Sequence, residues 1–177
     1  MKPSNINTPD ELQEAIAIQL EQMGKVVQEL LFLRNDVGDR EPTFREVAAG
    51  SSFLAQFYTG IENILKCISY FHKVPLPTGD TWHIDLFQRF CHPPYKTLPE
   101  LFNKQMEAEL APFRKFRHVV HHGYTFDMRW DDFKDGINVI EQVFAKLRGR
   151  LQTYCIELSQ DGSGSAPPPP PVGGLSM

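Results

Sequence analysis

The chain has 177 residues, of which 41% are hydrophobic and 23% charged, as is typical of one soluble globular domain with a core. Its 18 lysines and arginines against 22 aspartates and glutamates give a net charge of −4. That excludes non-specific coating of duplex nucleic acid driven by net charge but allows a local basic patch. No apolar stretch approaches the roughly 18 residues of a membrane span, the N-terminus lacks a signal-peptide core, and the three cysteines have no CxxC spacing. We therefore expect a reduced, cytoplasmic chain without a membrane partner.

The first two predicted elements are long amphipathic helices. Residues 1–9 form a polar lead in which Thr8 is a suitable N-cap, followed by the proline that the first helical position favours. Apolar residues at spacings of three and four continue from there to about Gly38. A second apolar stripe begins after Pro42-Thr43 and ends near His72, which predicts a second helix.

Three further helices are predicted in the second half. A connector rich in proline and glycine, residues 74–80, precedes a short helix from Trp82 to about Cys91. The stretch from Leu98 to Gly123 predicts one helix, bent near Pro112 because an interior proline removes a hydrogen bond. A last long helix is predicted from Trp130 to about Leu158, and no alternating run predicts a strand. The expected fold class is all-α, an up-and-down bundle of four main helices plus a short one.

The predicted helical domain covers residues 10–160, and both tryptophans and the 13 phenylalanines are expected in its core. Residues 161–177 have a different composition, with glycines and serines on both sides of five consecutive prolines. Such a segment cannot bury a core. The prolines could bind the groove of a proline-recognising domain, but a disordered tail is the simpler interpretation.

A cationic strip lies on the predicted helix 98–123. At about 100° per residue, the phenylalanines and valines of its second half share one side of the helix, and the basic residues lie on the opposite arc. This strip consists of Arg114, Lys115, Arg117, His118, His121 and His122.

Three interpretations of the cationic strip stay open. It could be a solvated basic face, which is the ordinary role of a run of charges. It could bind a metal, since His118 and His122 are four residues apart, but no carboxylate lies between them and the flanking arginines repel a dication, so no metal and no other cofactor is expected. It could bind phosphate, because arginine donates a fork of hydrogen bonds and histidine titrates near neutral pH. These are the groups that metal-free cleavage of RNA requires.

Arg117, His122 and Tyr124 form an R-x4-H-x-Y pattern. This pattern resembles the signature of HEPN-type ribonuclease toxins, specifically the HepT-like group, and the string from 116 to 124 is similar to the typical string of that family throughout. A bare R-x4-H pattern is frequent by chance. The tyrosine and the position at a predicted helix end make the resemblance more specific.

A second segment, residues 58–66, resembles the second helix of the same family, where an acidic residue commonly lies. Here that residue is Glu62. It could form a surface ion pair with Lys66 one turn on, which contributes little, or it could orient Arg117 or a histidine. The all-helical layout agrees with the family over roughly residues 10–158.

The resemblance implies the toxin of a type II toxin–antitoxin system: a metal-independent endoribonuclease, for which tRNA is one candidate substrate, leaving 2′,3′-cyclic phosphate ends. It also implies a homodimer and a cognate minimal nucleotidyltransferase antitoxin that adenylylates Tyr124. Under this hypothesis His122 is the general base or acid and Arg117 binds the scissile phosphate. The remaining members of the strip, Arg114, Lys115, His118 and His121, extend the phosphate track.

The spacing of the motif adds a geometric constraint. Residues five apart lie about 140° apart around a helix, so Arg117 and His122 cannot share one face. Either the helix end unwinds near Gly123, or one site takes groups from two chains of a symmetric dimer. Tyr124 could otherwise cap the helix and pack. The alternative to an enzyme is a non-catalytic helical module that binds a nucleotide or a nucleotidyltransferase partner through the same face.

Overall fold

The computed structural model describes residues 6–121 and 128–162, apart from the side chains of residues 115, 118–121, 161 and 162. Its elements confirm the predicted all-α bundle of four main helices and a short one. They are α1 (Pro9–Val37), α2 (Phe44–Phe71), α3 (Trp82–Gln88), α4 (Lys104–His121), the 3-10 turn η3 (Trp130–Asp132) and α5 (Lys134–Gly162). Over these two ranges, no helix is both long and apolar enough to cross a membrane.

Capping boxes begin both long N-terminal helices. The hydroxyl of Thr8 accepts a hydrogen bond from the backbone N–H of Glu11, whose side chain accepts one from the Thr8 N–H. Thr43 and Glu46 repeat this arrangement at the start of α2. Each box satisfies donors that the first turn of a helix leaves free, and the predicted N-cap role of Thr8 is confirmed.

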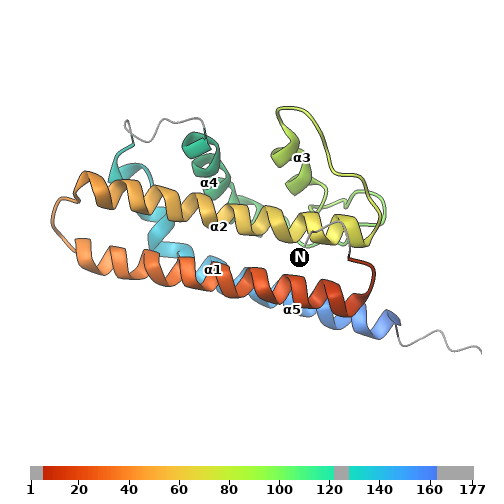
Figure 1. Ribbon diagram of the computed structural model, residues 1–177. Coiled ribbons are helices and arrows are strands. Elements are labelled where there is room, and N and C mark those ends of the chain that lie inside the picture. The colour runs from red at the N-terminus through yellow and green to blue at the C-terminus, as the bar shows by residue number, and fades with distance from the viewer. Residues whose placement is uncertain (1–5, 122–127, 163–177) are drawn as a thin grey trace, which may run out of the picture.

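The helix α2 is the centre of the bundle (Figure 1). On one side it runs next to α1, which in turn packs against α5; on the other side it contacts α3 and α4. Gly60 allows α1 and α2 to approach, because a Cβ atom at this position would lie 2.5 Å from Cγ of Met23. On its other side, α2 packs against α4, which is the helix that carries the cationic strip.

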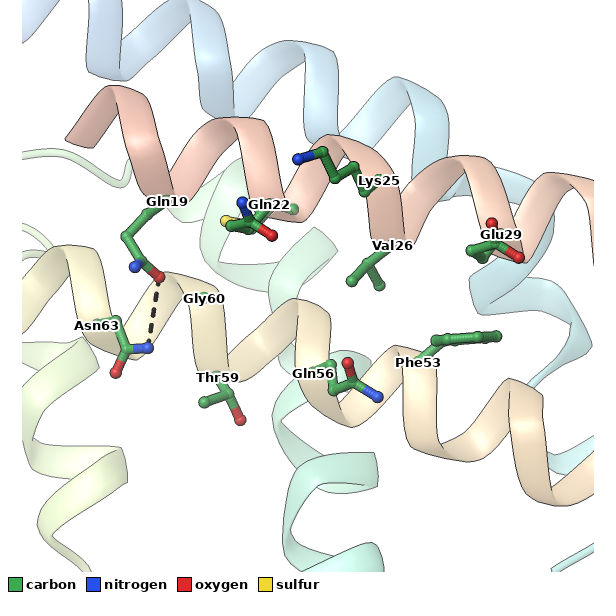
Figure 2. Close-up of a pocket in the computed structure, with 11 residues that line it drawn as sticks. Gln19, Gln22, Lys25, Val26, Glu29, Phe53, Gln56, Thr59, Gly60 and Asn63 are labelled. Atoms are coloured by element: carbon green, nitrogen blue, oxygen red, sulfur yellow. Dashed lines mark hydrogen bonds between the residues drawn. The ribbon is translucent and has the colours of Figure 1, made fainter. Parts of the chain in front are cut away.

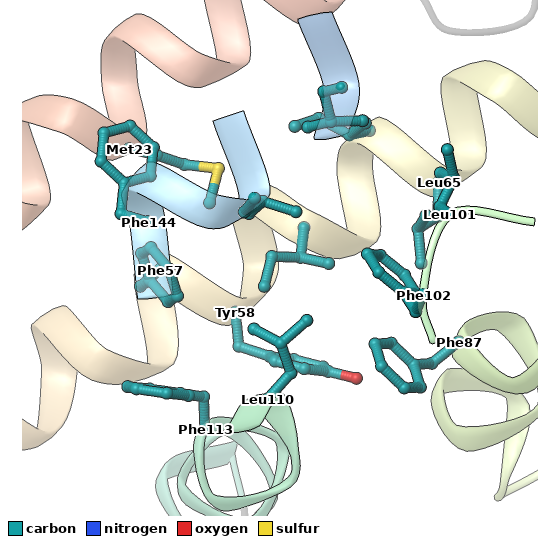
Figure 3. Packing of buried hydrophobic residues seen from close by; sticks show 14 of the residues in the cluster. Met23, Phe57, Tyr58, Leu65, Phe87, Leu101, Phe102, Leu110, Phe113 and Phe144 are labelled. Atoms are coloured by element: carbon teal, nitrogen blue, oxygen red, sulfur yellow. The ribbon is translucent and has the colours of Figure 1, made fainter. Parts of the chain in front are cut away.

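An aromatic core fixes α3 and α4 against α2 (Figure 3). The ring centroids of Phe57 on α2 and Phe113 on α4 are 5.3 Å apart, and those of Tyr58 on α2 and Phe87 on α3 are 6.4 Å apart. All four rings are buried. Because buried aromatic rings contribute large apolar areas and favour specific pair geometries, these contacts set the relative positions of the three helices.

Two predicted helix starts are wrong. The helix expected from Leu98 begins at Lys104, since the backbone N–H groups of Leu101 and Phe102 donate instead to the carbonyl of Phe90, at 2.9 and 3.1 Å. These bonds fasten residues 98–103 to the end of α3 in an irregular path. The helix expected from Trp130 begins at Lys134, after the turn η3. The short helix also ends earlier than predicted, at Gln88.

The prediction that every tryptophan and phenylalanine lies in the core is wrong in part. Phe32 is 57% exposed because it lies about 200° around α1 from the buried Leu30. Phe44, the first residue of α2, is 53% exposed. Both tryptophans are half-buried and pack against the edge of the core. The predicted helix end at Gly123 and the predicted tail beyond residue 162 lie outside the described residues.

Candidate functional site

Arg117 on α4 and Glu62 on α2 form a buried ion pair. The Nε atom of Arg117 lies 3.1 Å from each carboxylate oxygen of Glu62 and donates its hydrogen bond to Oε2. The two side chains are only 14% and 2% exposed. The interpretation of Glu62 as a surface partner of Lys66 is therefore wrong, and its contact with Arg117 is the one that the structure contains.

The aromatic core explains why these two residues meet. Phe113 precedes Arg117 by four residues on α4, and Tyr58, the neighbour of Phe57, precedes Glu62 by four on α2. Residues four apart lie one above the other on a helix face, so the packing of α4 on this part of α2, where Phe57 and Phe113 meet, brings the next turns together as well. Packing that the sequence predicts only as core thus places the arginine beside the carboxylate.

Burial dominates the electrostatics of the pair. Removal from water raises the pKa of Glu62 above its ordinary value, and the neighbouring charges of Arg117 and Lys66 oppose that shift. The Oε1 atom is buried and accepts no hydrogen bond from any described residue. A buried acceptor without a donor is unfavourable, so Oε1 remains available to a donor from the cationic strip or from a ligand.

Trp82 lies beneath two cations of this site. The guanidinium carbon of Arg117 is 5.3 Å from the centroid of its ring, and Nζ of Lys66 is 4.6 Å away. Both distances lie within the range in which a ring face attracts a cation. Trp82 is the first residue of α3. The sequence predicts it only as a core residue, because no spacing links a helix start after a loop to residues on two other helices.

Arg114 and Tyr58 extend the site towards α3. The guanidinium carbon of Arg114 lies 5.7 Å from the ring centroid of Phe87, one turn of α4 before Arg117. Burial raises the pKa of the Tyr58 hydroxyl well above its ordinary value, although Arg114 and Arg117 act in the opposite direction. The described site therefore holds three cations, Lys66, Arg114 and Arg117, and one carboxylate, and its electrostatic character favours an anionic ligand.

The other predicted site residues are outside what the structure describes. This applies to His122 and Tyr124 altogether, and to the side chains of Lys115, His118 and His121. The backbone of α4 is helical through His121, so His122 follows directly on the last described residue of the helix that carries Arg117. Elsewhere in the described ranges, no group of three or more histidine, cysteine or acidic side chains could hold a metal ion.

A separate hollow of about 330 Å³ lies between α1 and α2 (Figure 2). Amide side chains dominate its polar lining, and the Asn63 side chain donates to Gln19 across it at 3.4 Å. Gly60 and Met23 also line it. The hollow has one lysine and one glutamate in its lining and lacks the concentration of positive charge that distinguishes the Arg117 site.

Comparison with known proteins agrees with the motif. A family model described as HepT-like protein matches residues 49–158, a stretch that includes Glu62, Trp82 and the R-x4-H-x-Y pattern. No curated protein and no solved structure matches the chain. The match covers more than half of the chain and confirms the resemblance, so the chain belongs to the HepT-like family of HEPN toxin modules.

Proposed function

We propose that this protein is the toxin of a type II toxin–antitoxin system and acts as a metal-independent endoribonuclease. The observation that carries the proposal is Arg117. Its guanidinium donates to a buried carboxylate and lies over an indole ring, and it precedes His122 by five residues in a family of toxin modules. An arginine fixed in this way needs no reorganisation to receive a phosphate, which is how preorganised charges stabilise transition states.

The proposed reaction is an internal transesterification of RNA. His122 removes the proton of a ribose 2′-hydroxyl, and the 2′-oxygen attacks the adjacent phosphorus. The bond to the leaving 5′-oxygen breaks as that oxygen receives a proton from water, and the proton on His122 returns to the solvent. The products are a 2′,3′-cyclic phosphate and a free 5′-hydroxyl. The Nε atom of Arg117 donates to Glu62, which leaves the two Nη groups to bind the phosphate oxygens.

Glu62 and Trp82 act as positioning residues in this scheme, since both contact Arg117 and act through it. Glu62 fixes one edge of the guanidinium and Trp82 supports its face. The free Oε1 of Glu62 is also available to orient a histidine of the strip. Arg114, Lys115, His118 and His121 extend the phosphate-binding track along α4, and tRNA is one candidate substrate.

The test is cleavage of RNA by the purified protein in EDTA, with analysis of the product ends. We expect cleavage that survives chelation and leaves 2′,3′-cyclic phosphates. Cleavage that disappears in EDTA and returns with a divalent ion would instead favour metal-assisted hydrolysis. No cleavage of any RNA, together with retained binding of a nucleotide or a nucleotidyltransferase, would favour the non-catalytic module.

We further propose that the active form is a homodimer joined through α2 and α4. Arg117 and His122 diverge by about 140° on a continuous helix, and α4 continues as a helix past Arg117 to His121. Two chains related by a twofold axis can supply the arginine and the histidine of one site. Small-angle scattering should report a dimer at concentrations where the enzyme is active; full activity as a monomer would contradict this proposal.

A further inference from the structure

The loop after α3 carries a second group of cations around an aromatic ring. Tyr95 is 39% exposed; the guanidinium carbon of Arg89 lies 4.6 Å from the centroid of its ring, and Nζ of Lys96 lies 5.0 Å away. Neither cation forms an ion pair with a carboxylate in the described part of the chain, whereas the cations Arg40 and Lys146 do. We call Arg89, Tyr95 and Lys96 the loop site.

The backbone holds the loop site in a defined shape. The Tyr95 N–H donates to the carbonyl of Arg89 at 2.9 Å, and the Leu98 N–H donates to the carbonyl of Tyr95 at 3.1 Å. Lys96 has φ +54°, a left-handed conformation that is unfavourable for a lysine and persists only where the surroundings impose it. One guanidinium N–H of Arg89 donates to the carbonyl of Pro75 at 2.6 Å, which fixes the arginine over the ring.

A guanidinium that stacks on a ring keeps its in-plane donors free at the edge. Arg89 uses one of them for Pro75, so the others can bind a phosphate oxygen, and the ammonium of Lys96 adds a second charge to the same place. The groove beside them has a volume of about 540 Å³, and Pro93, Pro94 and the Tyr95 ring form the apolar part of its lining. Asp85 is the one carboxylate among the lining residues, against the two cations Arg89 and Lys96. This size and lining suit a nucleotide, with its phosphate on the cations and its sugar or base against the apolar wall.

The loop site is joined to the Arg117 site by α3. Trp82, the first residue of this helix, contacts Arg117 and Lys66 through its ring, and Arg89 directly follows the last residue of the helix. Seven residues of α-helix span only about 10 Å, so a short single strand can reach both ends. The ring and the unpaired cations favour single-stranded RNA, which proteins bind by combining positive charge with aromatic surfaces.

We propose that Arg89, Tyr95 and Lys96 form a phosphate-binding subsite for single-stranded RNA, beyond the phosphate that Arg117 holds. The inference rests on the proposed ribonuclease function. It adds a second point of contact that selects substrates with several unpaired nucleotides next to the cut.

The experiment measures binding of the full chain to a labelled 2′-O-methyl RNA of about twelve nucleotides, which cannot be cleaved because it lacks the 2′-hydroxyl. Arg89→Ala and Lys96→Ala should each weaken binding roughly tenfold. Each should also make the negative slope of log affinity against log salt shallower by about 0.7. Tyr95→Ala should weaken binding to a similar extent but leave the salt slope nearly unchanged, because it removes no charge. Tyr95→Phe, which keeps the ring, should bind like the wild type.

Two control variants remove similar cations elsewhere. Arg148 stacks on Phe144 of α5 at 4.9 Å, as Arg89 stacks on Tyr95, and Lys25 is an exposed lysine on α1. Arg148→Ala and Lys25→Ala should leave the affinity unchanged. Equal weakening by the controls would mean that net charge alone governs binding, and would overturn the subsite.

The remaining outcomes separate the two proposals. If the wild type cleaves RNA and the loop variants bind and cleave like it, the subsite is wrong and the ribonuclease stands. If the loop variants lose affinity while the wild type cleaves no RNA, the subsite stands and the ribonuclease is wrong. If the wild type cleaves RNA but does not bind this RNA, the subsite is wrong and the ribonuclease stands. If it neither binds this RNA nor cleaves any RNA, both proposals are overturned.

Discussion

The Nε atom of Arg117 lies 3.1 Å from both carboxylate oxygens of Glu62. Glu62 is one of only four buried polar or charged residues in the described chain. Burying a carboxylate is unfavourable unless a charge and hydrogen bonds compensate. Here Nε provides one hydrogen bond and Oε1 accepts none from a described residue. The pair is thus poorly suited to stabilising the fold, and functional sites commonly contain such arrangements.

The first prediction concerns Glu62→Gln and pH. Burial raises the pKa of Glu62 in the folded chain, so folding favours its protonated form, and the resulting stability is fully present only below the unfolded pKa, near 4.5. As pH rises through the folded pKa, the wild type must ionise a buried group and loses that stability. The glutamine has no such requirement. The free energy of unfolding, measured with denaturant, should therefore decrease for the wild type relative to Glu62→Gln as pH rises from about 4.5 to neutral.

Glu46→Gln is the matched control for this measurement, with the opposite sign. Hydrogen bonds from Arg40 and Thr43 lower the pKa of Glu46 from 4.5 to about 2. The stability that ionised Glu46 contributes is present above the unfolded pKa and is lost as pH falls through the folded pKa. The free energy of unfolding of the wild type should therefore increase relative to that of Glu46→Gln as pH rises. Parallel pH profiles for both variants would contradict the assigned burial of Glu62.

The second prediction concerns Arg117→Ala. From the sequence alone, this substitution on the polar side of a helix should leave the fold intact. The structure changes that expectation, because the substitution leaves Glu62 buried without its partner, at a cost of about 3–5 kcal/mol. Chemical denaturation near neutral pH should show this loss.

The double variant Arg117→Ala/Glu62→Gln separates stability from chemistry. It should recover most of the lost stability, because no buried charge remains. Its cleavage of RNA should nevertheless stay lower by about 10²–10³-fold, the usual effect of removing one group that stabilises a transition-state charge. Wild-type cleavage by the double variant would show that Arg117 serves the fold alone.

The third prediction concerns Trp82. Trp82→Ala removes the ring face that supports Arg117, so kcat should fall roughly two- to thirtyfold, the range of a cation–π contact. Trp82→Phe keeps an aromatic face and should restore most of the rate. Trp130→Ala, which removes the other tryptophan of the chain, is the control for a general loss of packing. A fall in melting temperature with unchanged kcat would limit Trp82 to a structural role.

The sequence predicts the fold well because its signals are local. Amphipathic stripes and the Thr8 cap lie within one helix each, and the structure confirms them. The predicted start of α4 is wrong because a contact distant in sequence, from Leu101 and Phe102 to Phe90, competes with helix formation. The same reason applies to the site. Arg117 belongs to a recognisable motif, whereas its contacts with Glu62 and Trp82 depend on three helices that only the folded chain brings together.

The fourth prediction tests the contact between α1 and α2. A Cβ atom at Gly60 would lie 2.5 Å from Cγ and 2.7 Å from Sδ of Met23, so Met23 must move aside in Gly60→Ala. Such overpacking destabilises by about 1–3 kcal/mol. A Cβ atom at Gly149 in α5 would meet no described atom within 4 Å, so Gly149→Ala should stabilise the chain by about 0.5–1 kcal/mol. Thermal unfolding of both variants gives the comparison, and a stable Gly60→Ala would contradict the close approach.

The fifth prediction concerns control of the proposed ribonuclease by a nucleotidyltransferase antitoxin. We expect a cognate nucleotidyltransferase to transfer AMP from ATP to the hydroxyl of Tyr124, forming an oxygen–phosphorus bond and releasing pyrophosphate. Tyr124 is two residues from His122 in the sequence. The phosphate of the attached AMP would compete with RNA for Arg117 and its basic neighbours, and the base would obstruct the site, so that one modification silences the nuclease without unfolding it.

The other tyrosines provide the comparison for this prediction. Tyr58 and Tyr154 are buried, and burial raises the pKa of both hydroxyls, which makes them poor acceptors. Tyr70 is half-buried, and Tyr95 is the exposed alternative, at 39%. After co-expression with the nucleotidyltransferase, intact-mass and peptide analysis should find AMP on the wild type and on Tyr95→Phe, but not on Tyr124→Phe, which should remain toxic. AMP on Tyr95, or an unmodified wild type that is nevertheless neutralised, would show that the antitoxin acts in another way, in the second case by binding alone.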